Sequence, residues 1–117
     1  MNQKLMHPSN HLFYDSLVKT DSSCKDLTIS GLPNSKKGVI LSADSPITFI
    51  INMVKEKTVS KGIYENLSEA YIVLMLLRDL IKVMKVHPTQ IGVIVSYNSQ
   101  KNVIFEMIKK DKTFGNL

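Results

Sequence analysis

The sequence predicts an α/β fold with a parallel sheet built from two βα units. Two short β-branched and apolar runs, 47–51 and 91–95, show little polar alternation, which is typical of strands covered on both faces. A helix of about five turns between them returns the chain to the same edge, so the strands become parallel neighbours through a right-handed crossover. A second helix follows the second run. The order strand, helix, strand, helix therefore sets the fold class.

The first helix is predicted over 67–84. Asn66 and Glu69 have the spacing of a capping box, and the apolar side chains that follow cover most of the circumference. Such a helix is buried on more than one side. The pair His87-Pro88 closes it. The second helix is predicted to be capped by residues 96–98 and to run to about Lys109.

The chain is expected to divide near residue 45. Residues 1–45 form an N-terminal helix and extended-loop segment, and residues 46–117 form the βαβα core. Ser, Asp, Gly and Pro crowd the stretch 20–44, which predicts a long loop with a weak strand at 39–41. A loop this long is either a functional excursion or a segment that has lost its packing partner. Because two strands do not make a stable sheet, we expect this core to be partial.

Composition and charge exclude several classes of protein. The chain has 117 residues, 44% of them hydrophobic and 21% charged, with a net charge of +5 that modestly favours an anionic partner. The single Cys24 excludes an internal disulfide framework and suits a reducing compartment. The first residues do not form a signal peptide, and the apolar stretch 70–77 is shorter than the roughly 20 residues of a membrane span. We expect an intracellular protein, cytoplasmic or nuclear, without a membrane partner.

The edge of the sheet where the second strand ends is the candidate binding site. Ligands bind outside the carboxyl ends of parallel strands, and residues 95–100 are also a helix N-terminus that attracts phosphate. Ser96, Asn98 and Gln100 add polar groups there, and Tyr97 adds a ring that can pack on a sugar or base. The alternative is that Ser96 and Asn98 only cap the helix while Tyr97 packs half-buried. The local pattern by itself favours that alternative.

No other constellation indicates catalysis. The five glycines are scattered, so a phosphate-binding loop is absent from this sequence. His7 and His11 could meet on one helix turn, but Pro8 lies between them and no third metal ligand is evident. We therefore predict no catalytic residue and no metal site.

Residues 91–100, with the sequence IGVIVSYNSQ, resemble the "IGIITPYxxQ" motif of superfamily 1 helicases of the up-frameshift and senataxin type. In that family the motif lies in the second (C-terminal) RecA-like domain. Four further segments agree in order and spacing. Residues 3–8 are similar to "QYRMHP", 10–15 to "xxLFYDGxL", 46–51 to "PLLFID" and 66–70 to "YNxxEA". The likeness covers nearly the whole chain apart from the 20–44 loop.

The resemblance implies a partial RecA-like, P-loop NTPase-type three-layer fold and a part in ATP-driven unwinding or remodelling of RNA or DNA. In the family, two RecA-like domains clamp ATP and Mg²⁺ between them while single-stranded nucleic acid lies across both. The implied nucleic-acid-binding residues are Ser96, Tyr97, Asn98 and Gln100. The implied nucleotide-cleft residues are Gln3, His7 and Pro8.

The departures from the family pattern bear on catalysis. Lys4 stands where the family has an aromatic residue that packs on the base, and Leu5 stands where it has an arginine that reaches the terminal phosphate. A leucine cannot supply the charge that stabilises a phosphoryl transition state, and Lys4 lacks the planar fork of arginine. The Walker A, Walker B and later arginine motifs are absent from this sequence. We expect this chain alone to bind no cofactor and to hydrolyse no ATP.

Two functions from different classes follow. The first is a fragment of an ATP-dependent RNA/DNA helicase that contributes nucleic-acid and ATP-cleft surfaces, with the first RecA-like domain as its partner in a longer chain. The alternative is a non-enzymatic α/β protein-interaction module derived from a helicase, which uses the sheet edge and the 20–44 loop as its surface. A third possibility, a small NTPase in its own right, requires a phosphate-binding loop that the sequence lacks.

Overall fold

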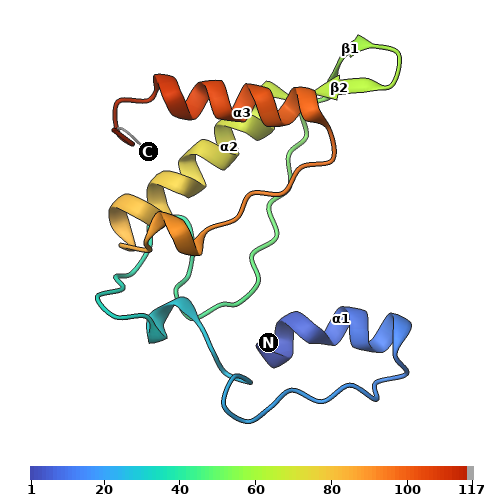
Figure 1. Ribbon diagram of the computed structural model, residues 1–117, viewed down its shortest axis with the longest axis vertical. Helices are drawn as coiled ribbons and strands as arrows, with labels where there is room; N and C mark the ends of the chain where they lie inside the picture. The colour runs from blue at the N-terminus through green and yellow to red at the C-terminus, as the bar shows by residue number, and fades with distance from the viewer. Residues whose placement is uncertain (116–117) are drawn as a thin grey trace.

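The computed structural model describes residues 1–115, which form a mixed helix and strand structure (Figure 1). The helices are α1 (Gln3–Phe13), α2 (Leu67–Arg78), which continues as the π-helical turn η2 (Asp79–Val83), and α3 (Asn98–Lys110). Two short 3₁₀ turns, η1 (Ile29–Gly31) and η3 (Pro88–Gln90), and the strands β1 (Lys57–Ser60) and β2 (Ile63–Glu65) complete the list. None of the helices in residues 1–115 has the length and apolar character needed to cross a bilayer.

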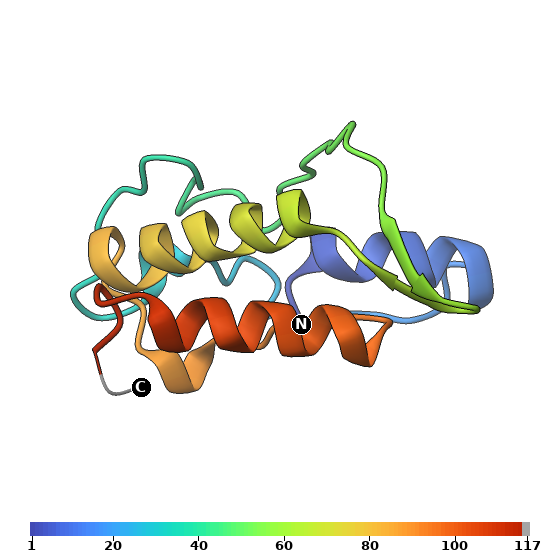
Figure 2. The same ribbon diagram turned by 90° about the horizontal axis from the view of Figure 1, so that it is seen from above.

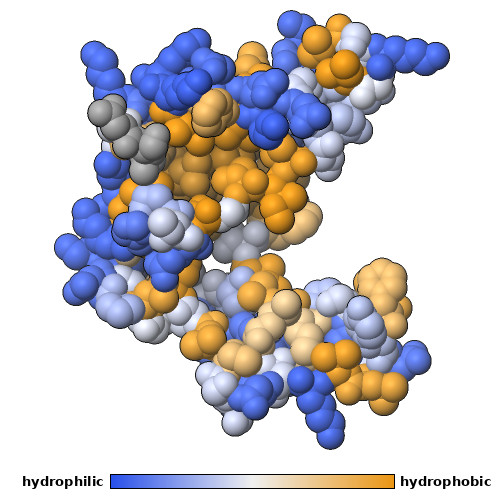
Figure 3. All heavy atoms as spheres, viewed as in Figure 1, coloured by the Kyte–Doolittle hydropathy of each residue, from blue (hydrophilic) through white to orange (hydrophobic). Residues whose placement is uncertain are grey.

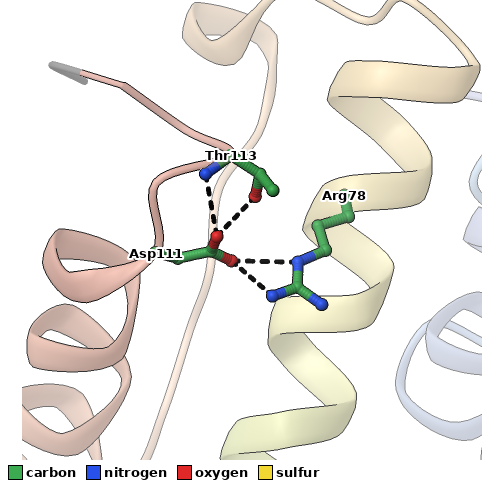
Figure 4. Close-up of polar contacts among 3 residues, drawn as sticks. All are labelled: Arg78, Asp111 and Thr113. Carbon is green, nitrogen blue, oxygen red and sulfur yellow. Dashed lines mark hydrogen bonds and ion pairs between the residues drawn. The ribbon is translucent and has the colours of Figure 1, made fainter.

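Helices α2 and α3 lie side by side and run in the same direction (Figures 1 and 2). Hydrogen bonds join them at both ends. At their starts, Gln100 of α3 bonds to the backbone of Asn66, which precedes α2. At their ends, the Arg78 guanidinium pairs with the Asp111 carboxylate at 2.7 Å, and the N–H and hydroxyl of Thr113 donate to the same carboxylate (Figure 4). Both predicted helices are confirmed, with the end of the first wound as a π-turn.

The core consists of two small clusters along α2. One holds Leu74, Leu77 and Phe114 between α2 and α3. The other holds Ala43, Met84 and Val86, where the 20–44 loop folds over the end of α2. The loop therefore has a packing partner, and that partner is the turn η2 with the residues just after it.

Asp79 fixes the 20–44 loop to α2. Its carboxylate is 3% exposed and accepts the backbone N–H groups of Val39, Ile40 and Leu41 at 2.7, 2.8 and 2.7 Å. A Cβ built on Gly38 would lie 2.4 Å from the Leu41 carbonyl oxygen and 2.8 Å from the carboxylate, so only glycine fits there. In a strand, successive backbone N–H groups point to opposite sides of the chain, so three consecutive N–H groups that converge on one carboxylate are incompatible with a strand. The predicted weak strand at 39–41 is therefore wrong.

The predicted parallel sheet is not formed within residues 1–115. Segments 47–51 and 91–95 are neither helical nor hydrogen-bonded as strands, although Figure 1 shows both as extended chain running in the same direction, opposite to α2 and α3. Extended segments need neighbours to complete their backbone hydrogen bonds, and two alone are marginal. The segments thus have the predicted order and direction, but they lack the backbone hydrogen bonds that would join them into a sheet.

The sheet that does form is an antiparallel hairpin of β1 and β2, in a stretch where no strand was predicted. It pairs Lys57 with Glu65 and Ser60 with Ile63, and Gly62 in its turn has φ of +75°, a left-handed conformation that suits glycine. The hairpin extends beyond the starts of α2 and α3 (Figures 1 and 2).

Candidate nucleic-acid interface

The turn at 95–97 leads into α3 at the edge of an open groove. The groove has a volume of about 770 Å³ and is bordered by both extended segments and by the inner faces of α2 and α3. Its lining includes Phe49, Ile51, Asn52, Val73, Ile94, Ser96 and Tyr97. Figure 3 shows the apolar side chains gathered around a hollow between the α2–α3 part of the molecule and α1. The predicted site residues Ser96 and Tyr97 thus lie on the rim of an apolar groove.

Tyr97 is held at this rim by the hairpin. Its ring meets the ring of Tyr64 from β2 edge to face, with centroids 5.4 Å apart and planes at 68°, yet the residue stays 45% exposed. The hydroxyl of Ser99 donates to the Tyr64 carbonyl at 2.6 Å and fastens the same two elements. Neither Tyr64 nor Ser99 was predicted as a site residue, because the hairpin that presents Tyr64 was not predicted. Tyr97 therefore presents a positioned, partly free aromatic ring.

The N-terminus of α3 lacks a side-chain cap. Tyr97 is the N-cap residue, and no side chain accepts a hydrogen bond from the first turn. The sequence alternative, in which Ser96 and Asn98 cap the helix, is wrong on this point, whereas its half-buried packing of Tyr97 is present. Both Ser96 and Asn98 are exposed. The first N–H groups of α3 thus remain available to an anionic group.

Gln100 lies inside the molecule. It is 7% exposed, and its amide oxygen accepts the Asn66 N–H at 2.8 Å while its amide nitrogen donates to the Asn66 carbonyl at 3.0 Å. The Asn66 side chain in turn accepts the N–H of Glu69 at 3.1 Å, as the capping-box spacing predicts. Gln100 therefore supplies the second half of that box from another helix. Its observed role is to align the starts of α2 and α3.

Carboxylates mark the hairpin side of Tyr97. Glu56, Glu65 and Glu69 line a pocket together with Tyr64 and Tyr97. Their charges repel phosphate. The neighbouring groove shares Glu69 and Tyr97 with this pocket, but Ser96 and apolar side chains make up most of the rest of its lining. An anionic strand that touches Tyr97 would therefore lie on the Ser96 side of the ring.

The residues implied for the nucleotide cleft lie on α1. Gln3 and His7 line a second groove together with Lys4, Lys25 and Asp44, and Pro8 does not line it. The start of α1 is tied to the following loop, since the side chain of Asn2 donates to the Leu27 carbonyl at 2.7 Å. Gln3 and His7 are thus brought together, in a groove different from the one at Tyr97.

Pro8 lies inside α1 without interrupting it. The rings of His7 and His11 therefore stack, with centroids 6.1 Å apart, and Pro8 does not keep them apart as the sequence had indicated. Among residues 1–115, no three His, Cys, Asp or Glu side chains are placed to hold a metal ion. Leu5, in the position of the family arginine, is 45% exposed.

Comparison with known proteins relates the chain to one family. A family model described as an AAA domain matches residues 1–116. The chain is also 29% identical over 105 residues to an uncharacterized ATP-dependent helicase of Methanocaldococcus jannaschii. That alignment covers 86% of this chain and 15% of the archaeal protein, so the chain spans only a small part of its relative's length. No solved structure matches. Because the family model covers nearly every residue, the chain belongs to the AAA domain family.

Proposed function

We propose that this chain is part of the second RecA-like domain of a superfamily 1 helicase of the up-frameshift and senataxin type. Membership of the AAA domain family and the relative described as an ATP-dependent helicase support the proposal. The order of elements also supports it, since two extended segments alternate with two helices along the chain. The two segments run in one direction, and the two helices run in the opposite direction. An intracellular location, cytoplasmic or nuclear, goes with this role.

The observation that carries the proposal is the placement of Tyr97. The extended segment 91–95 ends at the uncapped N-terminus of α3, and Tyr97 stands there partly exposed at the rim of a groove. In open α/β folds this edge binds ligands, and aromatic rings beside free N–H groups suit the bases and phosphates of a single strand. Ser96, Tyr97 and Asn98 are the proposed contacts, and Gln100 takes part by holding the turn in place.

We propose further that the two extended segments become neighbouring parallel strands of a three-layer sheet when more strands flank them. Their side chains are apolar, as in sheets covered on both faces. Phe49 is 87% exposed and Ile94 is 97% exposed, which is unusual for apolar side chains of a finished core. In the same assembly Gln3, His7 and Pro8 would face ATP and Mg²⁺ held against the first RecA-like domain.

Binding of a single-stranded oligonucleotide of about 20 nucleotides, RNA or DNA, at about 50 mM salt tests the proposal. Tyr97→Ala is expected to weaken binding about tenfold, because stacking on one aromatic side chain contributes about 1–3 kcal/mol. Tyr97→Phe keeps the ring and is expected to bind like the parent chain. Tyr71→Ala removes a tyrosine that is 60% exposed on α2, away from the groove, and serves as the matched control.

Equal affinity for Tyr97→Ala and Tyr71→Ala would contradict the proposed site. A chain that binds no oligonucleotide even at low salt, but captures a protein through the exposed apolar segments, would instead favour the protein-interaction module. The acidic pocket beside Tyr97 and the exposed Phe49 and Ile94 are the observations that support this second candidate.

The chain by itself is expected to release no phosphate from ATP. Leu5 cannot supply the charge of an arginine at the terminal phosphate, and the sequence contains no phosphate-binding loop. A phosphate-release assay checks this, with a His7→Ala variant as the background. Release by the parent chain above that background would contradict the expectation.

A further inference from the structure

The positive charge of the molecule is concentrated at one end. The chain has fifteen Lys and Arg and ten Asp and Glu, and the region where α2 and α3 finish holds eight of the former and three of the latter. The remaining seven basic and seven acidic residues balance, so this region carries the whole net charge of +5. We call it the basic end; its cations are Lys36, Lys37, Arg78, Lys82, Lys85, Lys109, Lys110 and Lys112.

Three segments far apart in the sequence meet to form the basic end. The backbone N–H of Lys36 donates to the Met84 carbonyl at 3.0 Å, which places the 36–37 loop beside η2. The pair of Arg78 and Asp111 joins the end of α2 to the end of α3 (Figure 4). All eight basic residues are exposed. The cations therefore lie in one region of the folded chain, although no run of charge in the sequence marks it.

Each of the three acidic residues of the basic end pairs with a group of the protein itself. Asp79 is buried and accepts three backbone N–H groups. The Asp111 side chain is 7% exposed and pairs with Arg78, and Glu106 pairs with Lys109 at 3.4 Å. These are the ion pairs of the basic end within residues 1–115. Six lysines, at positions 36, 37, 82, 85, 110 and 112, thus face solvent without a carboxylate partner there.

The basic end is separate from the surface at Tyr97. The two lie at opposite ends of α3, whose 13 residues span roughly 20 Å at about 1.5 Å per residue. That separation exceeds the screening length of about 8 Å at physiological salt. The lysines of the basic end are therefore largely screened from the Tyr97 site and form a separate surface.

We propose that the basic end binds the phosphate backbone of nucleic acid, without regard to base sequence, as a second contact surface of this chain. The inference rests on the proposed function, in which the chain acts on nucleic acid. Exposed lysines are strongly hydrated point charges that pair with phosphates but do not read bases.

An acidic peptide is the competing ligand. A small apolar groove lined by Val39, Ile40 and Met75 lies beside Arg78 and Lys82 and could hold the apolar side chains of such a peptide. The charge, however, extends to Lys36, Lys37, Lys110 and Lys112, which do not line that groove. The charged surface of the basic end thus extends beyond the groove in which such a peptide would bind.

The salt dependence of oligonucleotide binding by the whole chain tests the inference. For a single strand, each phosphate contact contributes about −0.7 to the slope of log K against log salt concentration. The double variant Lys82→Gln with Lys85→Gln is expected to reduce the slope by about 1.4 and to lower affinity at about 50 mM salt roughly tenfold. Lys110→Gln with Lys112→Gln is expected to act alike. The control, Lys57→Gln with Lys61→Gln, removes the same charge from the hairpin and is expected to leave the slope nearly unchanged.

Equal slopes for the basic-end and hairpin variants would overturn the inference, since only total charge would then matter. So would competition by polyglutamate as efficient as that by an unlabelled oligonucleotide of equal charge, because the surface would then prefer an acidic polypeptide. The Tyr97→Ala variant separates the two proposals. If Tyr97→Ala lowers the affinity without changing the salt slope, and the lysine variants change neither, the proposed function stands. The basic end would then not be a contact surface.

Discussion

Asp79 anchors the 39–41 turn of the 20–44 loop to the end of α2. Its carboxylate accepts three backbone N–H groups of the 39–41 turn while it lies buried at the end of α2. Asp79→Ala would leave these donors without a partner, at a cost of about 3 kcal/mol in the free energy of unfolding. Urea denaturation measures the loss. A loss no larger than that of Asp26→Ala, at an exposed position in the loop after α1, would contradict the anchoring role.

The same contact makes the free energy of unfolding depend on pH in the acidic range. Burial raises the pKa of the Asp79 carboxyl, but the N–H groups of Leu41, Val39 and Ile40 outweigh this, so its pKa lies below the ordinary value. A lowered pKa means that the stabilisation is complete above the pKa of the unfolded chain, about 3.9, and is lost as the pH falls through the folded value. We expect stability to be flat from about pH 5 to 7 and to fall below about pH 4, and the fall to be shallower in Asp79→Asn. Denaturation midpoints across that range check this; an equally steep fall in both proteins would contradict it.

Little of this residue-scale detail could be predicted from the sequence. Asp79 follows an apolar helix and has the pattern of any exposed carboxylate, because its partners lie 38 to 40 residues away. Gln100 was singled out for its motif, yet the structure shows a buried residue bonded to Asn66. Tyr97 could be identified, since a residue between a strand-like run and a helix lies at the ligand edge wherever that topology forms.

At the scale of elements, the starts of α2 and α3 depend on Gln100. Gln100→Ala would remove the acceptor of the buried Asn66 N–H, although the Asn66 carbonyl would keep its bond to the Ala70 N–H. We expect a loss of about 2 kcal/mol in the free energy of unfolding. At temperatures where the variant stays folded, its oligonucleotide affinity is expected to change less than that of Tyr97→Ala. A variant as stable as the parent chain but defective in binding would show instead that Gln100 contacts the ligand directly.

The helices were predictable because their signals are local. A cap residue and a run of apolar positions within 67–84 are read from neighbouring residues, and both helices appear where expected. The strands were predicted from equally clear local runs, but a strand exists only through a partner, and neither 47–51 nor 91–95 has one in residues 1–115. The hairpin was missed because its strands are only three or four residues long and mostly exposed, without a run of apolar residues.

At the scale of the whole molecule, the two extended segments leave an unusual apolar surface around the groove (Figure 3). Phe49, Ile51 and Ile94 are 87, 73 and 97% exposed. We expect the folded chain to increase the fluorescence of a dye such as anilinonaphthalene sulfonate, and Phe49→Ser with Ile94→Ser to reduce that signal. Because these side chains are already exposed, the free energy of unfolding should change by less than about 0.5 kcal/mol. The matched control, Leu12→Ser with Phe13→Ser on α1, should leave more of the signal; an equal reduction would contradict a groove-centred surface.

Binding of nucleic acid where segment 91–95 enters α3 is our claim, and NMR of the backbone amide signals during addition of a single-stranded oligonucleotide measures it. We expect the largest shifts on residues 96–99, with a second, salt-sensitive group at 82–85 and 109–112. Tyr97→Ala should abolish the first group and spare the second. Shifts confined to the basic end, or spread evenly over the exposed lysines with residues 96–99 unmoved, would contradict the claim.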